Sequence, residues 1–463
     1  MVVENLKYIG PFLRINTLST DIMEKQLSFF SRESFKHIVL NSRCGITTSI
    51  HQFKFKNIPN FDINIFKKNS PLLCIYKKAN PKLSIDKDSC SWDSDTFKKE
   101  VPVGANAFMT LTLIEAGNYY KQFQDINSSL FAMSKLYSQL AVKQLDFFSS
   151  NLRNAEGVFV DKKDSSEDSA KELVFEDKAK KFKFSDQALL MAAYHKASQL
   201  PDNNDSEAYK SFSFDILKMF LDYKSELYDL SLEELNKLCF AVNIFYDSSK
   251  DEASKYLLTD LCDFLIDKYY EQASDGSIKT ENMSMLYINM YCAYNNLALL
   301  KFKEESDKIF EAMDALYDSE RGLFITDKEK KEIDYSSEEI VLYTVCQLLS
   351  HKLYPDSPAS VLTDVYKRQF INSGVILSWP ETPNLSSPER YRNFSMKSED
   401  LIEDHYFRMP TLPTPEHAEL APILIKSITY NNKKDTFEQG KGTFDSSKNM
   451  FLLFSIQYLL KEL

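Results

Sequence analysis

The stretch Leu316–Phe324 reads LYDSERGLF, and a capping box, Ser336-x-x-Glu339, follows it. The glycine at position 322 supplies the positive φ with which a chain leaves a helix, and the phenylalanine two positions later predicts an anchor in the core. A capping box predicts that a new helix begins directly behind it. The stretch therefore predicts a joint between two helices, in which one apolar side chain anchors a polar loop.

The same joint, a glycine followed two positions later by an apolar residue, recurs along the chain. The other copies are Gly157-Val158-Phe159, Gly276-Ser277-Ile278, Gly374-Val375-Ile376 and Gly442-Thr443-Phe444. Signals for helix starts recur as well, at residues 185, 231, near 281, 336 and 414. Apart from one long gap they are roughly 50 residues apart, a period that predicts a repeated pair of antiparallel helices.

The predicted helices are of two kinds. Met285–Ala298 and Ile340–Leu349 are apolar nearly all round, as expected for helices surrounded by protein. The segment between them has a single stripe, in which Phe302, Ile309 and Met313 share one face and charged residues occupy the other. Buried and half-buried helices in alternation predict two concentric layers.

The loop Leu316–Phe324 with its capped helix resembles the turns of six-hairpin α/α toroids, a superfamily that includes many glycosidases, sugar epimerases and polysaccharide lyases. The resemblance covers residues 101–463 and implies an all-α toroid of about six helical hairpins. It implies a carbohydrate ligand and a glycoside hydrolase, epimerase or lyase; the alternative is a non-catalytic interaction scaffold with the same fold. The whole chain is also similar to uncharacterised clostridial proteins that share Tyr8–Arg14 (YIGPFLR), which implies no activity.

The first hundred residues have a different pattern. Thr20–Leu40 reads as a helix, and β-like runs such as Leu72–Tyr76 follow between proline and asparagine residues. We expect a small mixed cap region at residues 1–100, packed on the toroid domain of residues 101–463. The alternative is that this region supplies one helix of the hairpins.

The segment Asp364–Gln369, DVYKRQ, matches the translation of a transposase-adapter sequence used in DNA library preparation. We favour its interpretation as a scar of gene assembly over the alternative, an ordinary surface of an outer helix. Under the interpretation as a scar, helix boundaries between Val361 and Gln369 cannot be predicted.

Composition excludes several classes of partner. Hydrophobic residues make up 43% of the 463 residues, and the net charge is −11, which argues against nucleic acid. No apolar stretch approaches the length of a membrane span, so we expect no membrane contact. Seven scattered cysteines without a C-x-x-C pair predict free thiols and a cytoplasmic location. The sequence leaves the oligomeric state open.

Motifs for cofactors and metals are absent from the sequence. It has no G-x-G-x-x-G, no Walker A loop and only 10 glycines, so loops that cradle nucleotides are not expected. None of the six histidines stands in a pattern with metal-ligand spacing. We expect neither a cofactor nor a metal.

In α/α toroids the funnel lies where the inner helices begin, so the loops that lead into those helices are expected to line it. The longest, residues 372–414, holds one of only two tryptophans, Trp379, beside Glu381. A tryptophan next to a carboxylate suits a sugar-stacking platform with an acid nearby. The residues expected to bind substrate are Trp379, Arg390, Arg392, His405 and Glu416. In the alternative, the loop folds over the mouth, Trp379 fills a gap, and the arginines pair with Glu389 or Glu399.

Glycosidase chemistry needs two carboxylates, one protonated and one ionised. The candidates near the expected funnel are Asp161, Asp164, Asp186, Glu281, Glu338, Glu339, Glu381 and Glu416. A helix-start position explains Asp186, Glu234, Glu281 and Glu339 equally well as caps. The narrow prediction for the catalytic pair is Asp186 and Glu381. An epimerase would instead use two histidines, and His405 and His417 are the pair that would converge.

Overall fold

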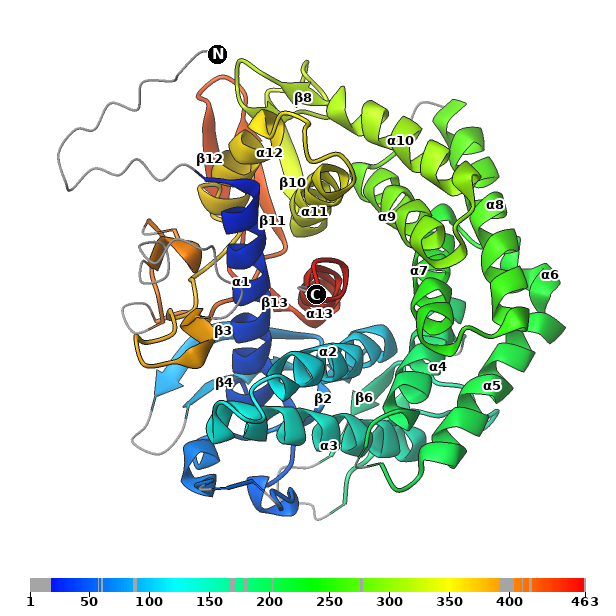
Figure 1. Cartoon of the computed structure of the whole chain (residues 1–463), viewed down its shortest axis with the longest axis vertical. Helices are drawn as coiled ribbons and strands as arrows, with labels where there is room; N and C mark the ends of the chain where they lie inside the picture. Colours follow the sequence, from blue (N-terminus) through cyan, green and yellow to red (C-terminus); the bar gives the residue numbers. More distant parts are fainter. Residues whose placement is uncertain are drawn as a thin grey trace.

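The computed structural model describes residues 18–463 except 57, 60, 86–89, 167–171, 179–180, 202, 275–277, 392–403, 410, 416–418 and 462–463. Six inner helices form a closed ring in which each helix packs on the next and the last packs on the first (Figure 1). These helices are α2 (Val103–Lys121), α4 (Phe184–Ser198), α7 (Leu232–Ser249), α9 (Thr280–Leu297), α11 (Ser337–Leu353) and α13 (Ser446–Leu459). Nearly every side chain of α2 and α11 is buried, as the sequence pattern predicts for surrounded helices.

An outer layer of helices surrounds the ring. It consists of α1 (Thr20–Asn41), α3 (Ser128–Asn151), α5 (Ser206–Asp222), α8 (Glu252–Ser274), α10 (Leu300–Asp314) and α12 (Ser360–Val365), with the π-helix η3 (Tyr366–Ile371) continuing α12. A short helix, α6 (Lys224–Leu227), leads from α5 toward α7. The two layers confirm the predicted α/α toroid of six helical hairpins.

The region before residue 100 contributes to this ring. α1 packs on α13 and completes the outer layer between α12 and α3 (Figure 1). Phe30 of α1 contacts Phe370, and Phe35 contacts Tyr137 of α3. The sequence left two alternatives for residues 1–100, a cap region and a region that supplies one helix of the hairpins. The position of α1 in the outer layer agrees with the second alternative.

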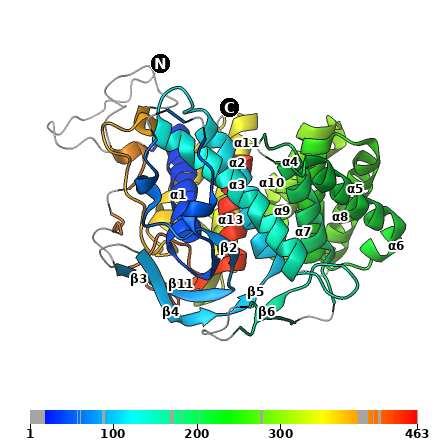
Figure 2. The same cartoon turned by 90° about the horizontal axis from the view of Figure 1, so that it is seen from below.

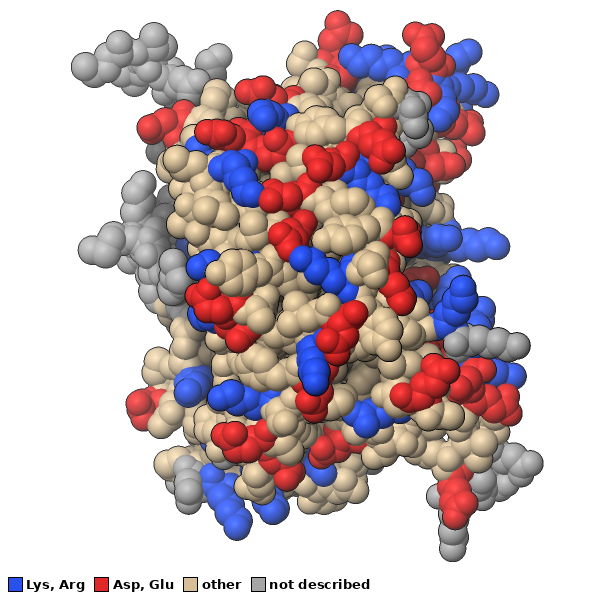
Figure 3. Space-filling model, turned by 90° about the vertical axis from the view of Figure 1, so that its right-hand side faces the viewer, with Lys and Arg blue, Asp and Glu red and all other residues tan. Residues whose placement is uncertain are grey.

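The outer face carries charges of both signs. On the side formed by α5, α8 and α10, lysines and acidic residues are interspersed (Figure 3). Lys224 pairs with Asp260 there, and Lys301 pairs with Asp263 at 2.6 Å. Among the described helices, none has the length and apolarity that a bilayer crossing requires.

Five small antiparallel sheets lie at the end of the ring where the inner helices begin (Figure 2). Two sheets have two strands each: β1 (Gly45–Thr47) with β2 (Leu72–Ile75), and β8 (Tyr317–Asp318) with β9 (Leu323–Phe324). Three sheets have three strands each, with β3 (Lys78–Ile85) between β13 (Phe444–Asp445) and β4 (Cys90–Lys98), and β6 (Lys162–Asp164) between β5 (Glu100–Val101) and β7 (Phe175–Asp177). In the third of these, β11 (Ser427–Asn431) lies between β10 (Glu332–Ser336) and β12 (Thr436–Gln439). Because β3 pairs with β13, the strand regions near both ends of the chain meet at this end of the ring.

Glycine joints occur where the sequence predicts them, but they turn the loops rather than end the helices. Gly157, Gly322 and Gly374 have φ of +83°, +62° and +84°, whereas Gly442 does not have a positive φ, and Gly276 lies outside the described residues. The helices α7 and α9 end instead at Lys250 and Ala298, both in the left-handed conformation. The prediction of a glycine at the helix end was therefore wrong in detail, because an ordinary residue takes that position.

A side-chain amide secures the main chain behind several joints. Gln187 of α4 accepts the N–H of Phe159 and donates to its carbonyl oxygen, at 3.1 and 2.8 Å. Gln369 forms the same double contact with Phe324, at 2.8 and 3.2 Å. Two further pairs of this kind are Asn106 with Ile75 and Asn449 with Leu424. We call these contacts amide clamps, and each one ties a helix to the extended segment beside it.

The segment Asp364–Gln369 takes part in this scheme. It forms the end of α12 and the start of η3, and Gln369 supplies the amide clamp on Phe324. Tyr366 is buried and donates a hydrogen bond to Gln26 of α1 at 2.8 Å. The segment thus carries contacts of the repeat through Tyr366 and Gln369.

Four of the five predicted helix starts are confirmed, at residues 184, 232, 280 and 337. The start predicted at Thr414 was wrong, because residues 411–415 and 419–426 are not helical, and the carbonyl oxygen of Pro413 accepts a hydrogen bond from the main-chain N–H of Trp379. The sixth inner helix begins at Ser446, where Asp445 accepts the N–H groups of Ser447 and Lys448.

Candidate functional site

A cavity opens at the end of the ring where the inner helices begin. It consists of two hollows of about 180 and 230 Å³ that share Glu233, Lys237, Glu338 and Phe451, and we call them together the mouth cavity. All six inner helices contribute to its wall. The funnel expected from the resemblance is thus present at the expected end, formed by the helix starts themselves.

The wall is rich in charges of both signs. Its carboxylates are Asp161, Asp186, Glu233, Glu234, Glu281 and Glu338, and its lysines are Lys183, Lys237, Lys279 and Lys448. Lys237 pairs with Glu233 at 2.7 Å, and Lys448 pairs with Glu338 at 2.5 Å. The hydrogen bond from Lys237 lowers the pKa of Glu233, so this carboxylate is ionised at neutral pH.

Several carboxylates at this end support helix starts. Asp161 accepts the N–H of Val103 at 2.8 Å, and Glu234 accepts that of Ser185 at 3.0 Å, so each caps a helix other than its own. Glu339 closes the predicted capping box with Ser336. These contacts confirm the structural interpretation of Glu234 and Glu339. The other four wall carboxylates cap no main-chain N–H of the described residues: Glu281 accepts a hydrogen bond from the Ser336 hydroxyl at 2.8 Å, and Asp186, Glu233 and Glu338 face the cavity.

Asp186, in the first turn of α4, differs from these neighbours. Its side chain is 8% exposed, and within the described part of the chain its carboxyl accepts no hydrogen bond. Burial raises the pKa of Asp186 to about 7; Lys183 opposes this shift, and the negative charges of Asp161 and Glu234 add to it. Asp186 is therefore a carboxylic acid that keeps its proton close to neutral pH inside a polar cavity.

A raised pKa alone does not mark a functional group. Burial and the nearby Glu281 also raise the pKa of Glu339 to about 7, yet this carboxyl belongs to the capping box of α11 and does not line the mouth cavity. The position in the cavity, and not the shifted pKa, separates Asp186 from Glu339.

Aromatic rings lie deeper in the ring, behind the mouth cavity. Phe108 of α2 contacts Phe451 and Phe454 of α13, with ring centroids 5.3 and 5.4 Å apart. Phe240 of α7 reaches the same rings and Tyr458. These contacts close the centre of the toroid, so the mouth cavity ends on an apolar floor where Phe108 and Phe451 line it.

Trp379 does not lie in the mouth. Its ring is completely buried, packs on Phe30 of α1 with centroids 5.0 Å apart, and donates a hydrogen bond to the carbonyl oxygen of Phe407 at 2.9 Å. A ring without an exposed face cannot stack on a sugar, so the prediction of a stacking platform was wrong. The alternative interpretation, in which Trp379 fills a gap, agrees with this buried position.

The other predicted residues of this loop are also outside the mouth cavity. Arg390 is buried and pairs with Asp404 at 2.7 Å, and the carbonyl oxygen of His405 accepts a hydrogen bond from Gln26 of α1. Glu381 is exposed and does not line the cavity, so the structure does not bring it to Asp186. Arg392, Glu416 and His417 lie outside the described residues. The loop lies along the outer side of α1 (Figure 1).

Sequence reasoning overlooked Glu233, Lys237 and Lys448. Each lies within the first two turns of an inner helix, on α7 or α13. The start of α7 was predicted at residue 231. If the first turns of all inner helices are expected to converge, Glu233 and Lys237 follow from that prediction. The start of α13 was misplaced by about 30 residues, so Lys448 carried no usable signal.

Comparisons with known proteins return distant structural likenesses only. No protein-family model matches the chain, and no curated protein sequence does. Similar solved structures include a D-mannose isomerase (10% identity, 84% of this chain and 91% of that chain covered, TM-score 0.48). Others are the endoglucanase of the termite Nasutitermes takasagoensis (10%, 96% and 99%, 0.46) and the cellobiose 2-epimerase of Bacillus thermoamylovorans (12%, 67% and 82%, 0.45).

Proposed function

We propose that this chain is an enzyme that acts on carbohydrate in the mouth cavity, with Asp186 as its general acid. The observation that carries the proposal is the buried Asp186 carboxyl, which lines the cavity with a pKa of about 7. A carboxylic acid that holds its proton near neutral pH can protonate a leaving glycosidic oxygen or a sugar carbonyl.

Glu338 is the proposed second carboxylate. It stands at the start of α11, which lies across the ring from α4, and it lines the same hollow as Asp186. Nζ of Lys448 lies 2.5 Å from Oε2 of Glu338, and this ion pair orients the carboxylate. Asp186 and Glu338 thus approach a bound molecule from opposite walls, the arrangement that acid–base chemistry on one bond requires.

The rest of the wall suits a molecule rich in hydroxyl groups. Lys237 and Lys279 donate hydrogen bonds, Glu233 accepts them, and Asn282 does both. Phe451 adds an apolar surface for the C–H face of a sugar ring. These groups support a saccharide substrate, and the reaction is hydrolysis, epimerisation or lyase cleavage.

A non-catalytic binding scaffold is the second candidate, and two observations favour it. Aromatic rings close the channel behind the mouth, and Glu233 and Glu338 are each already paired with a lysine. A scaffold would bind saccharide or another partner in the mouth without converting it.

The test is a panel of oligosaccharides and reducing sugars incubated with the full chain. Reducing-end assays detect hydrolysis, proton NMR of the anomeric region detects epimerisation, and ultraviolet absorbance detects the unsaturated product of a lyase. Asp186→Asn is expected to lower the rate on the active substrate by at least about 100-fold, since general acid catalysis supplies a factor of this order.

Asp222→Asn is the matched control, because Asp222 is exposed at the end of the outer helix α5 and does not line the mouth cavity. Turnover that persists in Asp186→Asn would refute the role of Asp186. Saturable saccharide binding without any product would establish the scaffold instead.

We also propose that the protein resides in the cytoplasm. All six cysteines that the structure describes in full are free and buried, and the thiols of Cys239 and Cys262 lie 3.4 Å apart without a bond. A reducing compartment leaves such a pair as thiols. Cell fractionation tests this, and recovery of the protein with the secreted fraction would contradict it.

A further inference from the structure

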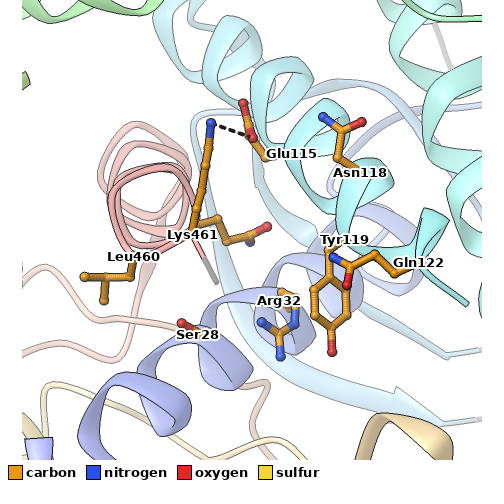
Figure 4. Close-up of a pocket in the computed structure, with 9 residues that line it drawn as sticks. Ser28, Arg32, Glu115, Asn118, Tyr119, Gln122, Leu460 and Lys461 are labelled. Atoms are coloured by element: carbon orange, nitrogen blue, oxygen red, sulfur yellow. Dashed lines mark ion pairs between the residues drawn. The ribbon is translucent and has the colours of Figure 1, made fainter. Parts of the chain in front are cut away.

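A second cavity lies at the opposite end of the ring, where the inner helices end. It has a volume of about 140 Å³ and lies between α1, α2 and α13. Its wall consists of Ser28, Arg32, Glu115, Asn118, Tyr119, Gln122, Gln457, Leu460 and Lys461 (Figure 4). We call it the rear cavity. None of these residues lines the mouth cavity, so the two sites are separate.

Cations outnumber anions in the rear cavity. Glu115 is buried and pairs with Lys196 at 2.8 Å and with Lys461 at 3.1 Å; Figure 4 shows the pair with Lys461. The guanidinium carbon of Arg32 lies 3.8 Å from the centre of the Tyr119 ring, and Nε of Arg32 lies 3.8 Å from a carboxylate oxygen of Glu389. Of these charged groups, Arg32, Lys461 and Glu115 line the cavity, and together they carry one net positive charge.

Two polar groups in the wall have no partner among the described residues. The hydroxyl of Ser28, in a residue that is 3% exposed, and the side-chain Nε2 of Gln457 are both buried without a hydrogen bond. Buried polar groups in native proteins are nearly always paired, and leaving one unpaired is costly. Both Ser28 and Gln457 line the rear cavity, so a bound molecule can supply the missing acceptors.

We propose that the rear cavity binds a small oxyanion, the carboxylate or phosphate group of a metabolite. Lys461 supplies charge, and Ser28 and Gln457 donate hydrogen bonds to its oxygens. Because the site joins the first outer helix to the last inner helix, the bound anion also stabilises the closure of the ring.

The experiment is calorimetric titration of the full chain with inorganic phosphate and with acetate, alongside glycerol as an uncharged probe. We expect saturable binding of at least one anion and none of glycerol, with a rise in the melting temperature on anion addition. Comparing the phosphate and acetate arms identifies which oxyanion the site prefers. Lys461→Met and Ser28→Ala are each expected to weaken that binding about tenfold, as the loss of one charge-assisted hydrogen bond predicts.

Two matched variants make the test specific. Lys301→Met removes an exposed surface lysine, and Glu338→Gln alters the mouth cavity; both should leave anion binding unchanged. Melting curves without ligand establish that each variant folds. The proposal is overturned if neither anion binds, if glycerol binds as well as the anions, or if Lys461→Met and Ser28→Ala bind like the unaltered chain. Loss of binding in Glu338→Gln would also overturn it, by placing the anion in the mouth.

Discussion

Gly104 makes room for the carboxyl of Asp186. A Cβ atom at position 104 would stand 2.5 Å from Oδ1 of Asp186, which is closer than atoms in van der Waals contact approach one another. The first turns of α2 and α4 therefore pack through a glycine at the wall of the mouth cavity. The glycine is required here by space and not by its φ, which is not positive.

Gly104→Ala should displace the Asp186 carboxyl and impair the reaction. A shift of about 1 Å in a catalytic group costs about 100-fold in rate, so turnover of the substrate identified by the panel should fall by that order. Stability should change by less than about 1 kcal/mol, because a short side chain can move aside.

Gly157→Ala is the contrasting variant. Gly157 has a φ of +83° and no atom within 4 Å of the position that a Cβ would take. It should lose about 1 kcal/mol of unfolding free energy through backbone strain, with turnover unchanged. Equal turnover in Gly104→Ala and the unaltered chain would show that the position of Asp186 does not matter.

Asp186→Asn should stabilise the protein at alkaline pH. The folded pKa of about 7 lies above the ordinary value of 3.8, so the carboxyl stabilises the fold fully below pH 3.8 and loses this contribution as pH rises toward 7. Above pH 7 the folded chain bears the cost of a buried charge, which asparagine removes. Urea unfolding at pH 8 should show a gain of about 2 to 4 kcal/mol.

The same variant should show no such gain in acid. At pH 4 the carboxyl of the folded chain is protonated and resembles the neutral amide, so the two unfolding curves should nearly coincide. For the unaltered chain, the proposed activity, which depends on the protonated acid, should decline as pH rises through about 7. A gain in stability that is independent of pH would contradict the raised pKa of Asp186.

Gln187→Leu should destabilise the fold through its amide clamp. Leucine has similar volume but leaves the buried N–H and carbonyl groups of Phe159 without partners. The expected loss is about 2 to 4 kcal/mol in urea unfolding, since each unpaired buried group costs about 1 to 3 kcal/mol. Gln124→Leu, at an exposed position, should change stability by less than about 0.5 kcal/mol.

Asn289→Asp should destabilise the contact between α7 and α9 in a manner that depends on pH. Asn289 is fully buried and donates from Nδ2 to the carbonyl oxygen and Oδ1 of Asn236, at 3.0 and 3.1 Å. Seven residues on, Asn296 makes the same pair of contacts with Asn243. An aspartate at position 289 would lose these donors and gain a buried charge.

Burial would raise the pKa of the introduced carboxyl, so its cost should be smallest in acid and grow as pH rises above about 4. Melting temperatures of Asn289→Asp at pH 5 and pH 8 should therefore differ by more than those of the unaltered chain. Asn289→Leu, which introduces no charge, is the control, and its loss should not vary with pH. A pH-independent loss in Asn289→Asp would mean that water reaches this contact.

Much of the fold was predictable because it depends on local patterns. Four inner-helix starts could be read from the sequence. At two of them, α7 and α11, a serine cap lies next to the helix that it starts, whereas α4 and α9 begin without a side-chain cap. The apolar stripe of α10 likewise identifies its buried face. The start of α13 was missed because Asp445, its cap, follows the β11–β12 hairpin, and nothing local distinguishes it from Thr414.

The candidate site was predictable only in part. Asp186 was nominated and lies in the mouth cavity, but the loop with Trp379 and Arg390 packs along α1. Sequence position placed that loop before an inner helix and hence at the mouth. The apolar surface of α1 attracts its aromatic residues instead, and such a contact between residues about 350 positions apart leaves no trace in local spacing.

The sequence by itself determined a two-layered ring of helical hairpins, because periodic apolar residues, caps and turns act over a few neighbouring positions. Only the tertiary structure decided that Asp186 is buried across the ring from Glu338, with Lys448 paired to Glu338 and Gly104 beside Asp186. Burial and charge proximity are properties of space, and they bring together residues of α2, α4, α11 and α13 that no local pattern links. The pKa of Asp186, on which the proposed chemistry depends, therefore exists only in the folded chain.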